Sequence, residues 1–311
     1  MKSLKLAVND YLALRRSLGF KLAEYGVHLH DFVSFLGKNG SARVTNKLAV
    51  EYATQRQDEK PVSWSRRLGI IRGFARYRIG ADPKTEIPPL GLLKFRSQRA
   101  RPYLYSEHEI RRLLEAALNM RTHCELQRYT YHCLLGLLVV TGLRVGEAIR
   151  LQPQDVDLSE GILTVRGTKF GKSRLIPVAP STRAVLREYA KRRDQFLAGR
   201  PAPYFLVSTR GKRLQKQCIG KIFRSLSRQI GIREAGKRSG PRLHDFRHRF
   251  AVETLLRWYR NGEQATRRMP VLSTYLGHGN VTDTYWYLSS TPELIVAASK
   301  LIETRWKGVA Q

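Results

Sequence analysis

The sequence has few cysteines and no long apolar segment, and each absence excludes a class of protein. Three cysteines in 311 residues are too few, and odd in number, for a disulfide framework, so we expect reduced thiols. The most apolar run, CLLGLLVVTGL, is far too short to span a bilayer. The N-terminal stretch MKSLKLAVNDYLALRR is interrupted by charge and lacks a small-residue cleavage site, so no signal peptide is expected. We therefore expect a soluble, cytoplasmic protein without a membrane partner.

Acidic residues are also scarce. Asp and Glu number 25 against 56 Lys and Arg, which gives a net charge of +31 and an isoelectric point of about 10.7. Both parts of the chain are basic, because residues 1–100 carry 19 basic and 8 acidic side chains and the rest carry 37 and 17. Self-repulsion on this scale favours a polyanionic partner, and DNA is the usual one. Composition alone leaves open a basic solubilising surface, a ribosome-associated protein or an anionic membrane surface.

The first third of the sequence has the apolar spacing of short helices. Residues 4–12 and 29–36 repeat apolar side chains at helical intervals, Thr45 is placed to cap a third helix, and a fourth helix follows Pro61. The fourth helix carries arginines that we expect to point mostly outward and to contact DNA phosphates, although a solvated face has the same pattern. These arginines are Arg67, Arg72, Arg76 and Arg78.

Residues 81–104 have the composition of a linker between domains. They contain four prolines and five basic residues, and we expect Arg99 and Arg101 to lie along the DNA. Ser106 and Glu109 then form a capping box that opens a new helix. The sequence therefore predicts a helical DNA-binding domain at 1–98, a linker to about 104 and a catalytic domain at 105–311.

The catalytic domain is expected to contain one small sheet. The apolar period changes from helical to two in ILTVRG and RLIPVA, and the glycine-containing loop TKFGKS between them predicts a β-hairpin. YFLVS is a candidate for one more strand, and the rest of the domain has helical patterns. The predicted fold class is therefore mainly α with a small antiparallel β-sheet.

Three segments of this domain carry reactive side chains in a specific order. They are TGLRVGEAIRL (141–151), RLHDFRHRFA (242–251) and LGHGNVTDTYWYL (276–288), which supply an arginine, a His-x-x-Arg pair, a histidine and, nine residues later, a tyrosine. In this combination the sequence resembles the tyrosine recombinase/integrase family over about residues 105–300. The first third resembles, more loosely, the helical core-binding (SAM-like) domain of that family. The resemblance implies a site-specific recombinase that cuts and rejoins DNA strands.

These residue types suit attack on a phosphodiester. Five-coordinate phosphorus gathers negative charge on its equatorial oxygens, and planar guanidinium groups bind such oxygens in a bidentate way. Arg144 and Arg247 are the natural pair, and the three-residue spacing places His244 on the helix face of Arg247. We expect His278 to donate a further hydrogen bond to a nonbridging oxygen. Glu147 is expected to orient an arginine, although an ordinary surface pair with Arg144 has the same spacing.

Two tyrosines compete for the role of nucleophile. Tyr285 and Tyr287 are two residues apart on a helix, so they cannot share a face. The spacing of the family from its glycine-histidine pair selects Tyr287, and Tyr285 and Trp286 are then packing residues. A phenol with a pKa near ~10 needs a base or a positive field, and His244 is a candidate proton acceptor. The resemblance implies a covalent 3′-phosphotyrosyl bond, formed without metal, ATP or another cofactor.

The hairpin loop supplies the predicted general acid. Lys169 lies eight residues before Pro177, where the β-hairpin lysine of the family falls, and the resemblance implies that it protonates the departing 5′-oxygen. Lys172, in the same loop, is the alternative. Lys172 and Arg174 are also candidate DNA contacts.

The resemblance further implies a homotetramer on two double-stranded DNA sites that exchanges strands through a Holliday junction. Integration, excision, transposition or resolution of a DNA element would be its role, and it would be nucleoid-associated when bound to DNA. Accessory DNA-bending proteins or a sister recombinase are further expected partners. The amphipathic segment TPELIVAASKLIETRW is expected to dock on a neighbouring protomer or to fold back on its own domain. The segment RNGEQATRRM, within an extension at 255–270, is expected to be an exposed helix connection and is a candidate contact to DNA or to another subunit.

Three other functions fit parts of the pattern. A type IB topoisomerase or a telomere resolvase uses the same tyrosine, and a catalytically silent DNA-binding regulator keeps the same fold. A metal-dependent transposase or nuclease needs clustered carboxylates, and Asp155, Asp157 and Asp245 make no convincing triad. We therefore expect no metal site.

Overall fold

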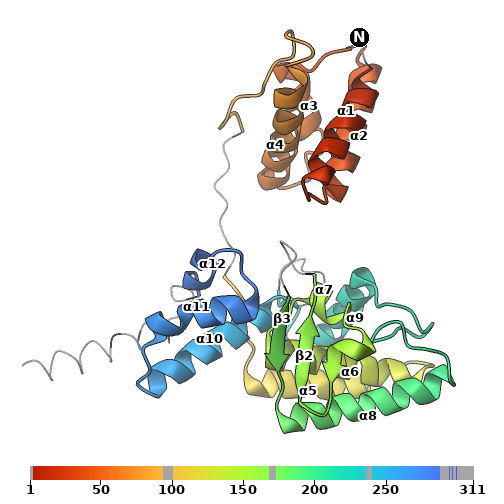
Figure 1. Ribbon diagram of the computed structural model, residues 1–311, viewed down its shortest axis with the longest axis vertical. Coiled ribbons are helices and arrows are strands. Elements are labelled where there is room, and N and C mark those ends of the chain that lie inside the picture. The colour runs from red at the N-terminus through yellow and green to blue at the C-terminus, as the bar shows by residue number, and fades with distance from the viewer. Residues whose placement is uncertain are drawn as a thin grey trace, which may run out of the picture. The chain divides into compact units, whose positions relative to one another are not determined.

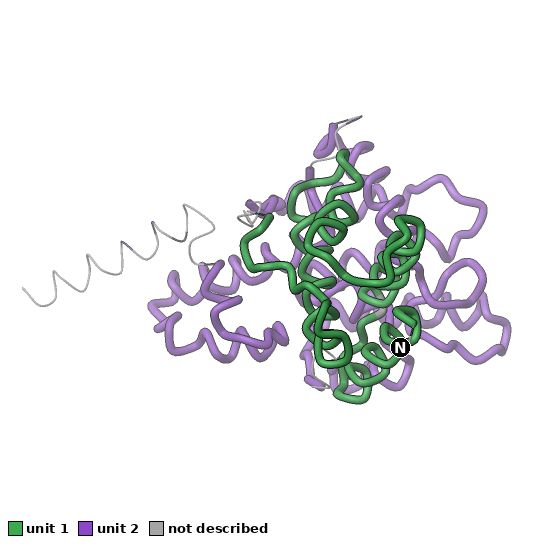
Figure 2. The backbone as a smooth tube through the Cα atoms, turned by 90° about the horizontal axis from the view of Figure 1, so that it is seen from above, with its two compact units in different colours: residues 1–100 green, residues 101–311 purple. Residues whose placement is uncertain are grey.

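The computed structural model describes residues 3–93, 101–167, 173–234, 236 and 240–287, together with the single residues Leu294, Val296 and Ser299. The chain divides into two compact units, residues 1–100 and residues 101–311, which are coloured separately in Figure 2. The division falls between the predicted end of the first domain at 98 and the predicted end of the linker near 104.

The first unit consists of helices (Figure 1). Their apolar faces share one core. Thr45 caps the third helix as predicted, because its hydroxyl accepts a hydrogen bond from the Leu48 N–H at 3.3 Å. Pro61 occupies the first position of the fourth helix, where a backbone N–H would make no hydrogen bond within the helix, so the N–H that proline lacks is not needed. The described helices are α1 (Leu4–Ser17), α2 (Ala23–Lys38), α3 (Asn46–Thr54) and α4 (Pro61–Arg78).

The predicted basic face of α4 is only partly exposed. Arg67 and Arg78 are 7% and 4% exposed, so the predicted outward orientation is wrong for both. Arg67 donates to the Ala53 carbonyl at 2.7 Å and pairs with the Glu59 carboxylate. These contacts tie α4 to the end of α3, so the Arg67 guanidinium is engaged within its own unit and its predicted DNA contact is replaced. Arg76 lies on the exposed face.

The second unit is mainly helical, as predicted (Figure 1). The predicted capping box opens its first helix: the Ser106 hydroxyl accepts from the Glu109 N–H at 3.2 Å, and the Glu109 carboxylate accepts from the Ser106 N–H at 2.7 Å. The described helices are α5 (Glu107–Leu118), α6 (Glu125–Thr141), α7 (Val145–Ala148), α8 (Pro180–Leu197), α9 (Lys216–Gln229), α10 (Asp245–Arg260), α11 (Ala265–Leu276) and α12 (Thr282–Tyr285), with a 3₁₀ turn at Pro153–Asp155.

The sheet of the second unit is small and antiparallel, which confirms the predicted hairpin. Its strands are β1 (Val156–Asp157), β2 (Ile162–Val165) and β3 (Arg174–Pro177), in the order β1-β2-β3. Val165 pairs with Arg174 at the end of the hairpin that leads into the loop 168–172, which lies outside the described residues. The further strand suggested by YFLVS is absent from the described residues, where Val207 forms only an isolated bridge with Arg213.

Two apolar clusters hold the second unit together. The larger one joins α5, α6, α8 and α9 to the sheet, with Leu113, Leu134 and Leu163 almost fully buried. The smaller one joins α10 and α11 and includes Leu255 and Leu276. No helix in the described ranges combines the length and apolar composition needed to cross a membrane.

The smaller cluster also modifies two predictions about the C-terminal part. Most of the segment RNGEQATRRM is helical, and Ala265 and Met269 are buried, so it is not simply an exposed connection. Leu294, from the predicted C-terminal helix, is 1% exposed and belongs to the cluster of its own chain. The other apolar positions of that predicted helix lie outside the described residues. They are Ile295, Ala298, Leu301 and Ile302.

Candidate active site

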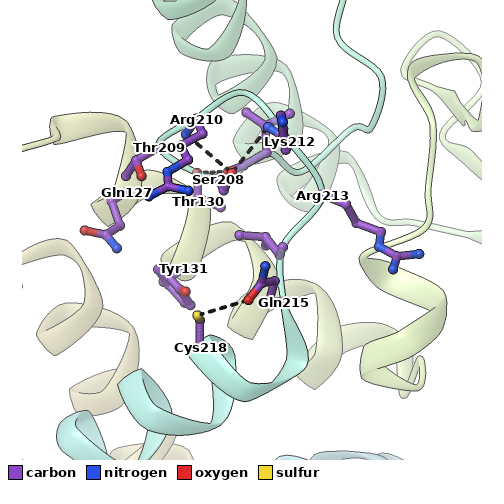
Figure 3. Close-up of a pocket in the computed structure, with 12 residues that line it drawn as sticks. Gln127, Thr130, Tyr131, Ser208, Thr209, Arg210, Lys212, Arg213, Gln215 and Cys218 are labelled. Carbon is purple, nitrogen blue, oxygen red and sulfur yellow. Dashed lines mark hydrogen bonds between the residues drawn. The ribbon is translucent and has the colours of Figure 1, made fainter.

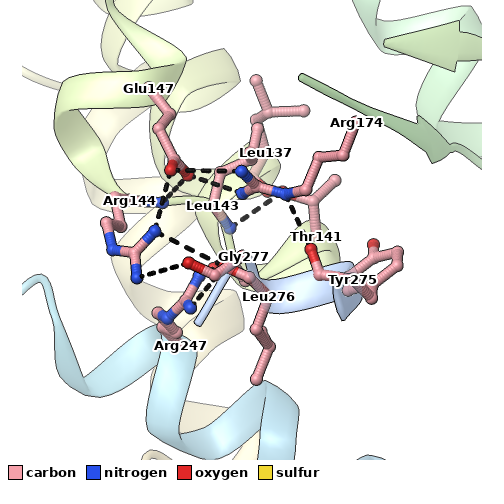
Figure 4. A network of polar contacts seen from close by, with 11 residues as sticks. Leu137, Thr141, Leu143, Arg144, Glu147, Arg174, Arg247, Tyr275, Leu276 and Gly277 are labelled. Carbon is pink, nitrogen blue, oxygen red and sulfur yellow. Dashed lines mark hydrogen bonds and ion pairs between the residues drawn. The ribbon is translucent and has the colours of Figure 1, made fainter. Parts of the chain in front are cut away.

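The C-terminal end of α11 binds three arginines from three separate elements (Figure 4). The last carbonyls of a helix have no partner within the helix and carry partial negative charge, so they attract cations. Arg174 comes from β3, Arg247 from α10 and Arg144 from the residue before α7. We call these residues the α11 arginine cluster. The contacts are Arg174 Nε to the Tyr275 oxygen at 2.7 Å, Arg247 Nη2 to the Leu276 oxygen at 2.5 Å and Arg144 Nη2 to the Gly277 oxygen at 3.1 Å.

Arg247 is the most deeply buried member of the cluster, with 1% of its surface exposed. Its Nη1 donates to the Gly142 carbonyl at 3.0 Å, so the ends of both α6 and α11 hold one guanidinium. Burial and the neighbouring Arg144 cation lower the pKa of Arg247 to about 10. The side chain is therefore still positively charged at neutral pH.

Glu147 joins the other two arginines of the cluster. Its carboxylate binds Arg144 Nη1 at 2.9 Å and Arg174 Nη2 at 2.7 Å, and only 3% of its side chain is exposed. Burial alone would raise the pKa of Glu147, but the hydrogen bonds and charge of Arg174 and the hydrogen bonds of Arg144 bring it below its usual value. These contacts are those of the predicted orienting role. The Arg174 side chain is 9% exposed, so its predicted DNA contact is replaced by an internal ion pair.

Glycine is required where α11 ends. Gly277 has a φ of +66°, a conformation that side chains with a Cβ rarely adopt. A Cβ at this position would also lie 2.8 Å from Arg174 Nη1 and 3.1 Å from its Cζ. The glycine of the glycine-histidine pair therefore allows the helix end and the Arg174 guanidinium to approach each other.

Of the two candidate nucleophiles, Tyr287 faces the cluster. It is 2% exposed, and the Arg247 guanidinium lies near enough to its phenol to lower the pKa of that phenol. Burial raises the pKa of Tyr287, and the Arg247 and Arg144 cations offset this only in part. The predicted positive field is present, but the phenol stays protonated at neutral pH. Tyr285 is 43% exposed, so its predicted packing role is wrong, whereas Trp286 packs on the smaller cluster.

Two histidines lie one turn apart at the N-terminal end of α10, and the second of them lies beside Tyr287. His244 lies at the N-terminus of this helix, and partial burial together with the Arg247 cation lowers its pKa. His248, one turn later, was not predicted as a site residue. Its ring centroid lies 4.8 Å from that of His244 and 5.4 Å from that of Tyr287. In the sequence, the four-residue spacing between His244 and His248 indicates that both rings lie on one helix face.

His278 follows Gly277 directly, and its ring also lies near that of Tyr287. The two ring centroids are 6.0 Å apart and the ring planes are inclined by 25°. Its Nδ1 lies 2.7 Å from the hydroxyl of Thr284, a fully buried residue that the sequence did not single out. Burial and the Arg247 and Arg144 cations lower the pKa of His278 to about 4, so the imidazole is neutral at physiological pH.

The remaining predicted residues fall into two groups. Lys169, Lys172 and Arg99 lie outside the described residues. Arg101 is exposed. Arg72 donates hydrogen bonds to the backbone carbonyls of Pro88 and Pro89, at 2.5 and 2.8 Å.

The aspartates considered for a metal-dependent enzyme do not meet. Asp155 pairs with Arg166 at 2.6 Å, and Asp245 pairs with Arg242 at 2.7 Å. Asp157 accepts from its neighbour Ser159. Within the described ranges, no three acidic, histidine or cysteine side chains lie close enough together to hold one metal ion.

A separate cavity of about 350 Å³ lies beside α6 and the start of α9 (Figure 3). Arg210, Lys212 and Arg213 line it together with Gln127 and Cys218. It contains none of the predicted catalytic residues, so we assign it no part in the chemistry.

Comparison with known proteins identifies the family. The sequence model described as "Phage integrase family" matches residues 104–293, more than half of the chain. The chain belongs to the phage integrase family of tyrosine recombinases. It is therefore an enzyme that transfers DNA strands.

Relatives of this recombinase cover nearly its whole length. It is 52% identical over 311 residues to a protein of Sinorhizobium fredii (strain NBRC 101917 / NGR234) named as an integrase/recombinase, y4rB, with 99% of each chain covered. It is 26% identical over 300 residues to tyrosine recombinase XerD of Oceanobacillus iheyensis, covering 93% of this chain and 95% of that one. A solved lambda integrase tetramer bound to a Holliday junction matches with a TM-score of 0.64 and 18% identity, covering 93% of this chain and 78% of that one. At this identity, the structural match shows a shared fold.

Proposed function

We propose that this recombinase cuts and rejoins DNA through a covalent 3′-phosphotyrosyl bond at Tyr287. One observation carries the proposal: the Arg247 and Arg144 guanidinium groups bind the same helix end within one subunit, and both lie near enough to the Tyr287 phenol to lower its pKa. A phosphodiester placed against these two guanidinium groups therefore lies beside the phenol oxygen.

The two arginines suit a phosphate for complementary reasons. Arg247 is held by two carbonyls and is almost fully buried, so its orientation is set before DNA binds. The side chain of Arg144 is 36% exposed, which leaves it accessible to a DNA backbone. A guanidinium has five N–H donors, so the contacts to carbonyls leave further donors for phosphate oxygens.

We assign the steps of the reaction to these residues as follows. The Tyr287 oxygen attacks phosphorus, the new P–O bond to tyrosine forms, and the bond from phosphorus to the 5′-oxygen breaks. Because burial keeps the phenol protonated, a base must accept its proton during attack, and we assign this role to His244. The 5′-oxygen leaves with a proton from Lys169, for which Lys172 is the alternative. The phosphotyrosyl bond conserves the energy needed for rejoining, so neither ATP nor a metal ion is assigned to the reaction.

We further propose that the working assembly is a homotetramer on two double-stranded DNA sites. The excess of 56 basic over 25 acidic residues supports DNA as the partner, and lambda integrase forms a tetramer on a Holliday junction. Integration, excision, transposition or resolution of DNA elements is the corresponding role, with accessory DNA-bending proteins or a sister recombinase as additional partners.

A nicked suicide substrate tests the nucleophile. The substrate is a duplex that carries a site selected for tight binding from a random library, with a nick that lets the cleaved end diffuse away. We expect a covalent adduct in excess EDTA, lost in Tyr287→Phe and retained in the matched control Tyr285→Phe. An adduct mapped to Tyr285, or an undiminished adduct in Tyr287→Phe, would contradict the proposal.

A substrate with a 5′-bridging sulfur tests the general acid. A thiolate leaves without protonation, so only loss of the true acid is rescued by this substrate. We expect rescue of Lys169→Ala and no rescue of Lys172→Ala. The reverse pattern would assign the acid to Lys172.

A further inference from the structure

The imidazole of the histidine beside the nucleophile has a polar partner, Thr284, that the motifs of the sequence did not indicate. Thr284 lies in α12 and is fully buried, and its hydroxyl oxygen lies 2.7 Å from His278 Nδ1. His278 in turn is stacked along the Tyr287 ring at 6.0 Å. The threonine therefore contacts the side of the imidazole that bears Nδ1 and leaves Nε2 available to the site.

The protonation of His278 makes this contact consequential. Burial and the Arg247 and Arg144 cations lower its pKa to about 4, and the opposing effect of Asp283 is smaller. The neutral ring carries one proton, which lies either on Nδ1 or on Nε2. A hydroxyl both donates and accepts, so the direction of its hydrogen bond decides whether Nε2 is a donor or an acceptor.

We propose that Thr284 is a positioning residue whose hydroxyl donates a hydrogen bond to His278 Nδ1. The proton of the neutral imidazole then resides on Nε2, and this Nε2–H donates a hydrogen bond to a nonbridging oxygen of the scissile phosphate. Phosphate oxygens only accept hydrogen bonds, so an Nε2 lone pair facing them would be repulsive. The contact to phosphate rests on the proposed function, whereas the tautomer is a property of the DNA-free protein. Thr284 acts through His278 and does not itself contact the reacting atoms.

Two substitutions separate the hydroxyl from the shape of the side chain. Thr284→Val keeps the branched shape and removes the hydroxyl, and Thr284→Ser keeps the hydroxyl and loses the methyl group. We expect the rate of single-turnover cleavage to fall about tenfold or more in Thr284→Val, because one hydrogen bond that orients His278 is lost. The rate should be largely retained in Thr284→Ser. DNA affinity should stay the same in both. Equal loss of rate in the two variants would overturn the proposal.

A double-mutant cycle distinguishes positioning from mere structural support. If Thr284 acts only through His278, adding Thr284→Val to His278→Ala should slow cleavage no further. An independent structural defect would multiply with the effect of His278→Ala, and that outcome would overturn the proposal.

Imidazole ¹⁵N chemical shifts provide a readout that needs no catalysis. In the Tyr287→Phe protein with ¹⁵N-labelled histidine, assigned through His278→Gln, we expect the Nε2–H tautomer of His278 and a shift toward Nδ1–H when Thr284→Val is added. A wild-type Nδ1–H tautomer would overturn the proposal. Absence of any covalent adduct with an Nε2–H tautomer would instead contradict the proposed function and leave the tautomer assignment standing.

Discussion

The buried carboxylate of Glu147 is the part of the site whose removal has the most predictable cost. It accepts the Arg144 N–H at 3.0 Å and also binds the guanidinium groups of Arg144 and Arg174. Glu147→Gln keeps the shape of the side chain but removes its charge. The new amide keeps one acceptor oxygen, and its NH₂ group faces at least one N–H donor across a buried contact.

The magnitude follows from burial. Breaking a buried ion pair by removing one partner costs about 3–5 kcal/mol, and the retained acceptor places Glu147→Gln near the lower value. For a unit of roughly 200 residues, about 3 kcal/mol corresponds to a fall in Tm of about 6–12 °C. Glu188→Gln is the matched control, since Glu188 pairs with Arg192 at 2.8 Å but its side chain is 52% exposed. We expect that control to cost less than about 1 kcal/mol.

Thermal and denaturant unfolding at several pH values test this reasoning. Arg174 and Arg144 lower the pKa of Glu147 in the folded protein, so its stabilising contribution is fully present above the pKa of the unfolded chain. The contribution is lost as pH falls through the lower folded pKa, and the difference between wild type and Glu147→Gln should shrink there. Equal stability of Glu147→Gln and Glu188→Gln at pH 7 would refute the assignment of Glu147 as the ionic centre of the cluster.

Three further predictions concern other parts of the chain. Gly277→Ala should slow cleavage and lower Tm, because its Cβ would displace the Arg174 guanidinium; a wild-type cleavage rate would contradict this. Burial lowers the pKa of His248 to about 4, so the free energy of unfolding should fall as pH drops from about 6.5 toward 4. In unfolding titrations, His248→Phe should reduce that fall by at most about 3 kcal/mol. Arg76→Gln should reduce the salt dependence of DNA binding by about one phosphate contact without changing Tm, whereas Arg67→Met should lower Tm and leave the salt dependence unchanged, as measured by fluorescence anisotropy and calorimetry.

Features with a local cause could be predicted from the sequence. The Thr45 cap, the Ser106 capping box and the β-hairpin depend on residues within a few positions of one another. A local rule also predicts that Tyr285 and Tyr287 point to different sides, because they are two residues apart on a helix, whereas the choice of Tyr287 depends on the family spacing. The structure brings Tyr287 and Arg247 together and leaves Tyr285 exposed.

Features that depend on distant carbonyls could not be predicted. The strongly basic composition predicts DNA contacts for Arg67 and Arg174, yet each is bound to a backbone oxygen and a carboxylate inside its own unit. A sequence shows the charge of an arginine but not the helix end that will face it. The sequence does not predict Thr284 and His248 as site residues for a related reason. Each belongs to the site because of the ring that it contacts in the folded chain.

Under the proposed mechanism, the charge of the α11 arginine cluster matches a phosphodiester at the moment of transfer. Its three guanidinium groups carry three positive charges, and Glu147, which joins two of them, carries one negative charge. The surplus of two positive charges exceeds the single charge of a phosphodiester and equals that of a five-coordinate phosphorus with two charges. The surplus also makes Arg247 easier to deprotonate in the DNA-free protein, because the Arg144 cation lowers its pKa in addition to burial. Under the proposed mechanism, repulsion among the fixed cations is therefore relieved most when negative charge is greatest, which favours the transition state over bound DNA.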